Sequence, residues 1–212
     1  VLVNGGFWAI GQSTDQITSS GQLIVGDAGN GSLLIDGAAN GISGQVTAFD
    51  ATIGKQAGGH GSVRLDGGLL LVANTNATGH TTLTVGDDGD GSLAIEHGSE
   101  VAVGAASAGN NGLLIVGRAD DGRGRIRIGD YSALLVYGDA HLGEAGVGEV
   151  TVGAGADHDA LFGVNGTLTL GAAGQLVLGG TDAMVRAEAL HIASGGVVSG
   201  WGTVSGLGGG NK

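Results

Sequence analysis

One phrase recurs along this chain in the same orientation, and its copies are 30 residues apart. An alternating apolar pair leads into a glycine-rich turn, and a Gly-Ser step and a second apolar pair follow. Residues 23–35 and 83–95 both have this pattern, and a weaker copy lies between them, so that Gly-Ser steps begin at Gly31, Gly61 and Gly91. A fixed period of this size is typical of stacked repeats rather than of a single compact globule.

The composition is consistent with short strands joined by glycine turns. Of the 212 residues 48 are Gly and none is Pro, yet 42% are hydrophobic. Collagen is excluded, because Gly does not occupy every third position and Pro is absent. A flexible linker is disfavoured, because the hydrophobic residues are numerous and alternate regularly with small or polar ones.

Alternation with a period of two predicts strands with one buried face, because successive side chains of a strand point to opposite sides. Each predicted strand is short, about three to five residues. The predicted inward pairs are Leu23/Val25, Leu33/Ile35, Val63/Leu65, Leu83/Val85, Leu93/Ile95, Val101/Val103, Leu114/Val116, Ile126/Ile128, Val150/Val152, Leu168/Leu170 and Leu176/Leu178. Residues 182–193 fit another strand as well as they fit a helix, and we assign them to a strand.

The spacing of these strands would also suit a sandwich or a barrel. A parallel β-helix is favoured because the phrase keeps one polarity and because the interior is small and aliphatic rather than aromatic. We therefore predict an all-β, single-stranded parallel β-helix (a solenoid) of about ten coils with roughly 20 residues each. Residues 1–212 are predicted to form one such segment, with 1–20 as a candidate N-terminal cap and 207–212 as a Gly-rich tail. Trp8 and Trp201 are candidates for covering the two ends of the stack.

The net charge of −12 argues against nucleic acid or an anionic membrane surface as a partner. With no Cys, the chain has no disulfides, thiol nucleophiles or zinc–thiolate sites. We expect no cofactor.

Four of the eight Lys and Arg residues are arginines close together in the sequence. They are Arg118, Arg123, Arg125 and Arg127. The last two flank the inward Ile126, so both should point outward. The cluster is a candidate contact for anionic glycans, lipopolysaccharide or an acidic face of a second copy, since the guanidinium group suits carboxylate and phosphate. The alternative is local charge balance, because exposed ion pairs are common and weak. The aspartates available for it nearby are Asp120, Asp121 and Asp130.

The acidic turn that holds Asp87, Asp88 and Asp90 offers carboxylates to calcium. Neither the EF-hand spacing nor the glycine-rich calcium nonapeptide is present, so a solvated turn is favoured and calcium binding stays open. The run 157–159 (Asp-His-Asp) is interpreted as a surface loop, because alternate residues of an extended segment face opposite ways. We predict no metal site.

Residues 83–101 resemble the repeats in passenger domains of Gram-negative autotransporters, whose pattern is loosely Leu-x-Val-Gly-x-x-Gly-x-Gly-x-Leu-x-Ile-x-x-Gly-x-x-Val. Residues 192–206 resemble the sequence that such passengers carry late in the stalk. The resemblance covers about residues 20–206. It implies a right-handed β-helix that is exported through an outer-membrane barrel and displayed outside the cell. The family includes adhesins, aggregation factors, proteases, esterases and toxins, but this chain has no Gly-x-Ser-x-Gly motif.

We therefore expect a surface-displayed autotransporter passenger segment that acts as an adhesin or a self-association stalk and has no catalytic residues. Its expected partners are surface glycans or proteins of a host or of bacteria, or a second copy of itself, and its membrane link would be a barrel outside this sequence. A carbohydrate-active enzyme is the first alternative, but it needs paired carboxylates near aromatic rings, and only Asp130 and Tyr131 near Arg127 suggest such a corner. An ice- or crystal-binding solenoid is the second, but its threonines, at 82/84 and 167/169, are too few.

Overall fold

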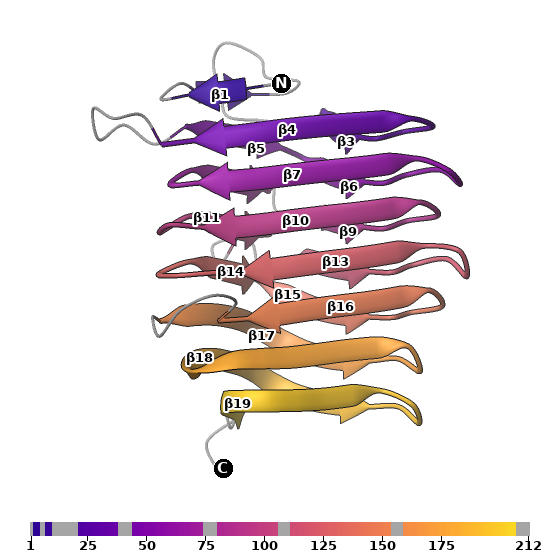
Figure 1. Ribbon diagram of the computed structural model, residues 1–212, viewed down its shortest axis with the longest axis vertical. Helices are drawn as coiled ribbons and strands as arrows, with labels where there is room; N and C mark the ends of the chain where they lie inside the picture. Colours follow the sequence, from indigo (N-terminus) through magenta and orange to yellow (C-terminus); the bar gives the residue numbers. More distant parts are fainter. Residues whose placement is uncertain are drawn as a thin grey trace.

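The computed structural model describes residues 2–4, 7–9, 21–37, 44–73, 80–105, 111–153 and 159–206. Nineteen strands lie in these ranges, and every pairing between them is parallel. Followed from the N-terminus, each coil crosses the front from right to left and returns behind it, one level lower (Figure 1). The chain is thus an all-β, right-handed, single-stranded parallel β-helix, and the predicted fold class is confirmed. No helix in the described ranges is long and apolar enough to cross a membrane.

Each coil contributes one strand to each of three parallel sheets. Sheet 1 contains β1 (Leu2–Asn4), β4 (Asn30–Asp36), β7 (His60–Asp66), β10 (Asp90–Glu96), β13 (Arg123–Ile128), β16 (Val147–Val152) and the first parts of β18 (Gly174–Ile192) and β19 (Val197–Gly206). Sheet 2 contains β2 (Phe7–Ala9), β5 (Gln45–Ala48), β8 (Leu69–Val72), β11 (Glu100–Val103), β14 (Ala133–Val136) and the first part of β17 (Ala160–Leu170). Sheet 3 contains β3 (Gln22–Val25), β6 (Asp50–Ile53), β9 (Thr81–Val85), β12 (Gly112–Val116) and β15 (Gly138–Leu142). Later parts of β17, β18 and β19 continue sheets 2 and 3.

The predicted coil length is wrong. Residues that meet across neighbouring coils are separated by 24 residues at Arg125 and Glu149 and by 32 at Asp50 and Thr82. A coil therefore takes about one repeat of the sequence rather than 20 residues, and sheet 1 holds eight strands rather than the ten expected. The reason is that a coil must complete three strands and the turns between them before it returns to the same sheet.

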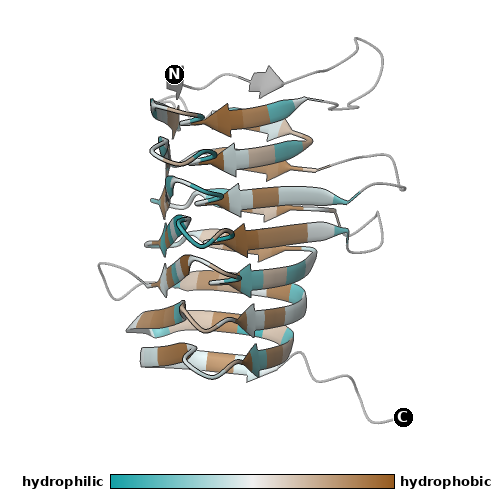
Figure 2. Cartoon of the chain, turned by 90° about the vertical axis from the view of Figure 1, so that its right-hand side faces the viewer, coloured by the Kyte–Doolittle hydropathy of each residue, from teal (hydrophilic) through white to brown (hydrophobic). Residues whose placement is uncertain are grey.

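All of the predicted inward pairs are buried. The ladder Leu33, Val63, Leu93 runs in register through sheet 1, and each member is at most 3% exposed. Such stacking places similar side chains on one another, about 4.8 Å apart. The interior is filled mainly by aliphatic residues, and Phe162 is the one buried aromatic side chain among the described residues. Apolar and polar residues accordingly alternate along the strands (Figure 2).

The turn between sheet 3 and sheet 1 explains much of the glycine content. Gly86 adopts a positive φ of 71°, and a Cβ built on it would overlap the backbone of Arg123 and Gly124 in the next coil. The turns of successive coils therefore lie directly on one another, and a residue without a side chain is needed at this contact.

The C-terminal region, residues 182–193, lies in β18 and the bend that follows it, as predicted for a strand. The last coil has no coil below it within the described residues, so inward positions such as Ile192 and Val204 are 50% and 42% exposed. Trp201 is 79% exposed and does not cover this end. The side chain of Trp8, most of the candidate cap at 1–20 and the tail at 207–212 lie outside the described residues.

Candidate functional site

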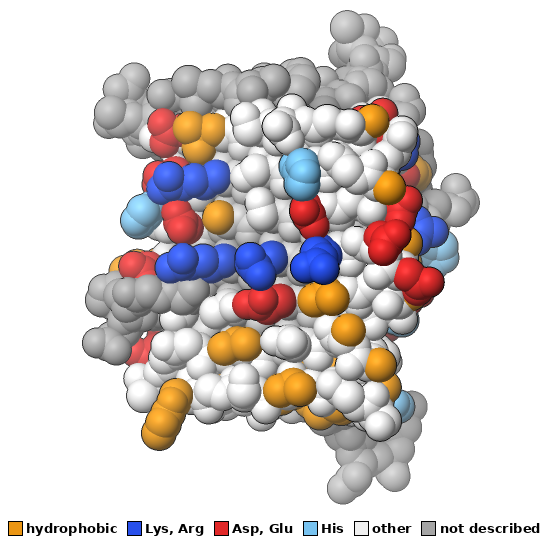
Figure 3. Space-filling view, turned by 45° about the vertical axis from the view of Figure 1, so that its right-hand side comes forward, with side chains coloured by type: hydrophobic (Ala, Val, Ile, Leu, Met, Phe, Trp, Pro, Cys, Tyr) orange, Lys and Arg blue, Asp and Glu red, His pale blue; other side chains and the backbone are white. Residues whose placement is uncertain are grey.

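Three arginines form a row across the outer surface of sheet 1. In β13 the burial pattern alternates strictly, so Arg123, Arg125 and Arg127 face solvent while Ile126 and Ile128 are buried. Alternate residues of one strand are about 7 Å apart, so the three guanidinium groups lie side by side rather than stacked. Figure 3 shows them as a row of blue side chains across this face. We call these three residues the arginine row.

Arg118, the fourth member of the predicted cluster, lies in the turn before β13 and not on the strand. Its Nη1 is 3.5 Å from Oδ1 of Asp87, which occupies the equivalent turn of the neighbouring coil. The structure therefore brings three of the four predicted arginines into one row. The fourth lies in a turn and contacts the equivalent turn of the neighbouring coil.

Arg125 is paired with an acid of the next coil rather than with one of its own coil. Nε of Arg125 lies 3.3 Å from Oε2 of Glu149, its register partner in β16. Arg123 has Asp90 and Val147 as register partners and forms no ion pair with any described residue. Among the described ion pairs none joins an arginine to the predicted aspartates. Those aspartates are Asp120, Asp121 and Asp130.

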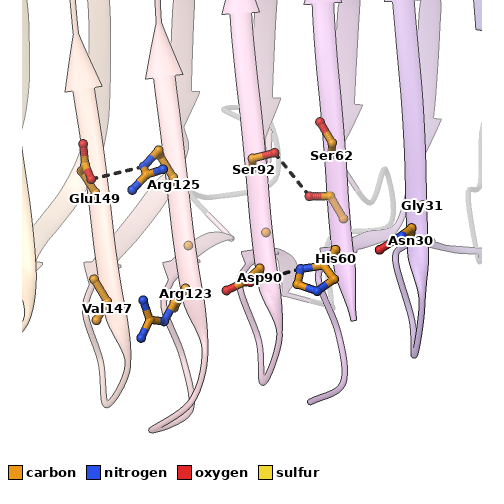
Figure 4. Close-up of a pocket in the computed structure, with 13 residues that line it drawn as sticks. Asn30, Gly31, His60, Ser62, Asp90, Ser92, Arg123, Arg125, Val147 and Glu149 are labelled. Atoms are coloured by element: carbon orange, nitrogen blue, oxygen red, sulfur yellow. Dashed lines mark hydrogen bonds and ion pairs between the residues drawn. The ribbon is translucent and has the colours of Figure 1, made fainter. Parts of the chain in front are cut away.

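A polar groove of about 560 Å³ lies on sheet 1 and includes one end of the arginine row. Its lining comes from five successive strands, β4, β7, β10, β13 and β16, so the groove runs along the axis of the solenoid. Figure 4 shows two columns of side chains in it, one near the turns and one further along the strands. The first column is Asn30, His60, Asp90, Arg123 and Val147, and the second includes Ser62, Ser92, Arg125 and Glu149.

The repeated Gly-Ser steps form the floor of the groove. Ser62 and Ser92 are register partners, and Gly61 and Gly91 stack beside them. Serine has a small side chain, so the surface is hollow over β7 and β10. In β13 the position in register with Ser92 is occupied by Arg125, whose side chain is much longer. This groove is not among the sites predicted from the sequence. The 30-residue spacing of the Gly-Ser steps could have revealed it once a coil was known to have that length.

The groove carries different charge at different levels. At the levels of β7 and β10, Nδ1 of His60 lies 3.1 Å from Oδ2 of Asp90. The next level holds Arg123 and Arg125, and the one after it holds Glu149. The Ser92 hydroxyl donates to the carbonyl oxygen of Gly61 at 3.4 Å.

These residues do not form a catalytic arrangement known from hydrolases. A Ser–His pair requires a hydrogen bond between the two side chains, but no such bond joins the described Ser62 or Ser92 to His60, whose Nδ1 faces Asp90. No Phe, Tyr or Trp side chain belongs to the groove lining. The geometry is that of a binding surface with donors, acceptors and one cationic level.

Within the described ranges, no three or more His, Asp or Glu residues come together as metal ligands. Asp87 instead faces Arg118, and Asp90 faces His60. Asp157 and His158, the other candidate ligands considered, lie outside the described residues.

Two aspartates on sheet 3 join neighbouring coils rather than forming a site. Oδ1 of Asp50 accepts the backbone N–H of Thr82 at 2.7 Å, and Oδ1 of Asp139 accepts that of Thr167 at the same distance. Burial raises the pKa of Asp50, and the hydrogen bond from Thr82 opposes this shift. Asp50 is thus a partly desolvated carboxyl with a structural partner.

Comparison with known proteins adds little to this description. No family model matches the chain, and no curated protein matches it. One solved structure with some similarity is a hyper-glycosylated fragment of TibA, residues 55–350, whose glycosylation is catalysed by TibC. It is 15% identical, and the match covers 94% of this chain and 80% of that one with a TM-score of 0.15. A likeness at that score assigns neither a fold nor a role to this chain.

Proposed function

We propose that this chain is part of a surface-displayed passenger of the autotransporter type and acts as a non-catalytic adhesin or self-association stalk. The observation that supports it most is the arginine row, which places three exposed cations on one face of an otherwise acidic rod. The resemblance of residues 83–101 and 192–206 to autotransporter passenger repeats supports the location outside the cell. The partner is a glycan or protein of a cell surface or a second copy of this chain.

A rod of stacked coils suits adhesion because it holds its outward side chains in fixed positions. Each exposed ion pair is worth about 0–1 kcal/mol, so one contact binds weakly. Many displayed copies on one cell raise the effective concentration of the partner and can increase avidity by about 10²–10⁴. The proposed mechanism is therefore multivalent display of the arginine row.

The test is a double charge reversal, Arg125→Glu with Arg127→Glu, in protein displayed on cells. Both side chains are outward on β13, so the circular dichroism spectrum should be unchanged while cell aggregation or adhesion falls. The matched control is Lys55→Glu with Arg186→Glu, which changes the net charge by the same amount at positions away from the row. Equal loss in both variants would indicate a net-charge effect, and no loss in the first would contradict a role for the row.

The non-catalytic part of the proposal has its own test. Prolonged incubation of the purified chain with acidic polysaccharides should release no new reducing ends and no unsaturated sugars. Turnover that is lost on Asp90→Asn or Glu149→Gln would instead support the carbohydrate-active enzyme, because these are the two carboxylates of the groove.

A further inference from the structure

We propose that the groove on sheet 1 binds a linear polysaccharide in which acidic and neutral sugars alternate, with the chain lying along the axis of the solenoid. This inference rests on the proposed function and names the ligand class of the same face. Four observations carry it: the direction of the groove, its hydrogen-bonding floor, the position of its cations and the position of its acids.

The direction and length of the groove fit an extended polymer. Five strands line it, and neighbouring strands are about 4.8 Å apart, so the groove extends over about 19 Å. One sugar unit of an extended polysaccharide has nearly the same length as this strand spacing. Consecutive sugars would therefore meet consecutive coils, one level each.

The floor offers groups that sugar hydroxyls recognise. Ser62 presents a hydroxyl group that can donate and accept hydrogen bonds, and Asn30 presents an amide at the end of the groove. The hydroxyl of Ser92 donates to the Gly61 carbonyl and can still accept. Glycines stand beside these serines, and Val147, at one end of the groove, is the one larger apolar side chain of its lining. A hydrophilic chain is favoured over a lipid or an apolar peptide.

One level of the groove is cationic. Arg123 makes no ion pair with a described residue, and Arg125 contacts Glu149 through its Nε. A guanidinium group has five N–H donors in a planar fork that matches the two oxygens of a carboxylate. A uronic acid placed at the level of β13 would therefore meet two arginines from one strand.

The acidic side chains of the groove determine at which levels a bound polysaccharide cannot carry a carboxylate. Asp90 lies one level before Arg123, and Glu149 lies one level after it. Carboxylates directly next to these side chains would be repelled, and each acid is also a good acceptor for neutral sugar hydroxyls. The sugars on both sides of the acidic unit should therefore be neutral, which is the pattern of an alternating copolymer.

Single-stranded nucleic acid is the competing polyanion, and the groove does not suit it. Proteins that bind single strands combine a continuous cationic track with aromatic rings on which bases stack. This groove has one cationic level, flanking acids and no Phe, Tyr or Trp in its lining. The overall charge of −12 adds long-range repulsion that a chain with a charge on every unit would feel most.

The experiment is titration calorimetry of the whole purified chain at low salt with three octasaccharides of equal length. They are a hyaluronan octasaccharide, in which glucuronic acid alternates with N-acetylglucosamine, an oligogalacturonate with an acid on every unit, and a neutral chitooligosaccharide. We expect hyaluronan to bind at least about tenfold more tightly than either of the others. Equal or tighter binding of the neutral sugar, or tightest binding of oligogalacturonate, would overturn the proposal, and so would no binding of any of them.

Three variants test the residues. Arg123→Gln should weaken hyaluronan binding about tenfold or more, whereas Arg186→Gln, on sheet 2, should leave it unchanged. Asp90→Asn should strengthen oligogalacturonate binding and reduce the preference for hyaluronan, an effect that a purely structural role of Asp90 would not produce. Unchanged circular dichroism and unfolding midpoints establish that each variant is folded. Hyaluronan binding that is the same in Arg123→Gln as in the natural chain would also overturn the proposal.

The two proposals can fail separately. If cells that display the chain still aggregate through the arginine row but no oligosaccharide binds, the ligand class is wrong and the adhesive function stands. If the alternating octasaccharide binds as expected but reversal of Arg125 and Arg127 leaves adhesion unchanged, the groove is a glycan site and the adhesive function is wrong.

Discussion

Replacing Gly86 with alanine is expected to cost about 2–5 kcal/mol of unfolding free energy, and two independent effects contribute. Gly86 has a φ of 71°, and an alanine in this left-handed region costs about 1–2 kcal/mol. Its Cβ would also overlap the backbone of Arg123 and Gly124, and overpacking of this kind typically costs a further 1–3 kcal/mol or so. Backbone cannot swing aside as the end of a flexible side chain can, so the second effect should not relax away.

Two other glycines separate these effects, because they lie in the same kind of turn in neighbouring coils. Gly58 has a φ of 76°, but a Cβ there would meet no atom within 4 Å, so its replacement should cost only the backbone strain of about 1–2 kcal/mol. Gly29 has neither a positive φ nor a close neighbour, so Gly29→Ala should stay within about 0.5 kcal/mol of the natural chain.

The assay is urea unfolding followed by circular dichroism, with thermal unfolding as a second measurement. For a chain of this size a change of 1 kcal/mol shifts the melting temperature by about 2–4 °C, so the three variants should separate clearly. Equal m-values would show that the same surface is exposed in each variant. Equal losses for Gly86→Ala and Gly58→Ala would refute the reasoning, because they would show that the turns do not lie on one another as described.

Two further predictions concern the core and the joints between coils. Ile95→Ala should lower the unfolding free energy by about 2–5 kcal/mol in urea titrations, because Ile95 is fully buried in a ladder and its removal leaves a cavity; a loss below 1 kcal/mol would contradict the tight packing. Asp50→Asn should raise the melting temperature at pH 7, because the amide oxygen can still accept the Thr82 N–H while the desolvated charge is removed. The pKa of Asp50 is raised in the folded state, so its contribution to stability is complete below the ordinary value of 3.8 and is lost as the pH rises through the raised value. The advantage of Asp50→Asn should therefore vanish in melting curves recorded near pH 3.5 and grow toward neutrality, and the opposite trend would show that burial does not dominate.

The strands could be predicted from the sequence because alternation is a local property. Leu93 and Ile95 are inward and Ser92 is outward simply because successive side chains of a strand face opposite ways. The length of a coil is not local. Nothing in residues 90–96 alone shows that β7 and β13 will be their neighbours, since this depends on how many residues the chain uses to complete three strands and the turns between them.

The same distinction applies to the site. Alternation around Ile126 was enough to place Arg125 and Arg127 outward, and the structure adds Arg123 to the same row. The partners of the arginines were sought among aspartates nearby in the sequence, whereas Arg118 and Arg125 face acids that are 31 and 24 residues away. In a stacked solenoid the nearest side chains in space belong to the next coil.

This geometry also determines where charge can accumulate on the rod. Side chains in one column are about 4.8 Å apart, whereas outward neighbours along a strand are about 7 Å apart, so like charges repel more strongly along the axis than across it. Charges of opposite sign accordingly follow one another along the axis from Asp90 to Arg123 and from Arg125 to Glu149.

Where acids do stack, as Asp66 and Glu96 do, a cation from the adjacent column offsets the repulsion. Arg64 lies 3.1 Å from the carboxylate of Asp66 and 3.0 Å from that of Glu96. Cations can therefore gather in a row across one coil but not in a column along several. A polymer that lies in the groove meets the carboxylate of Asp90, then the arginines of β13, then the carboxylate of Glu149. The spacing of the polymer's own charges, and not their number, should therefore determine whether it binds.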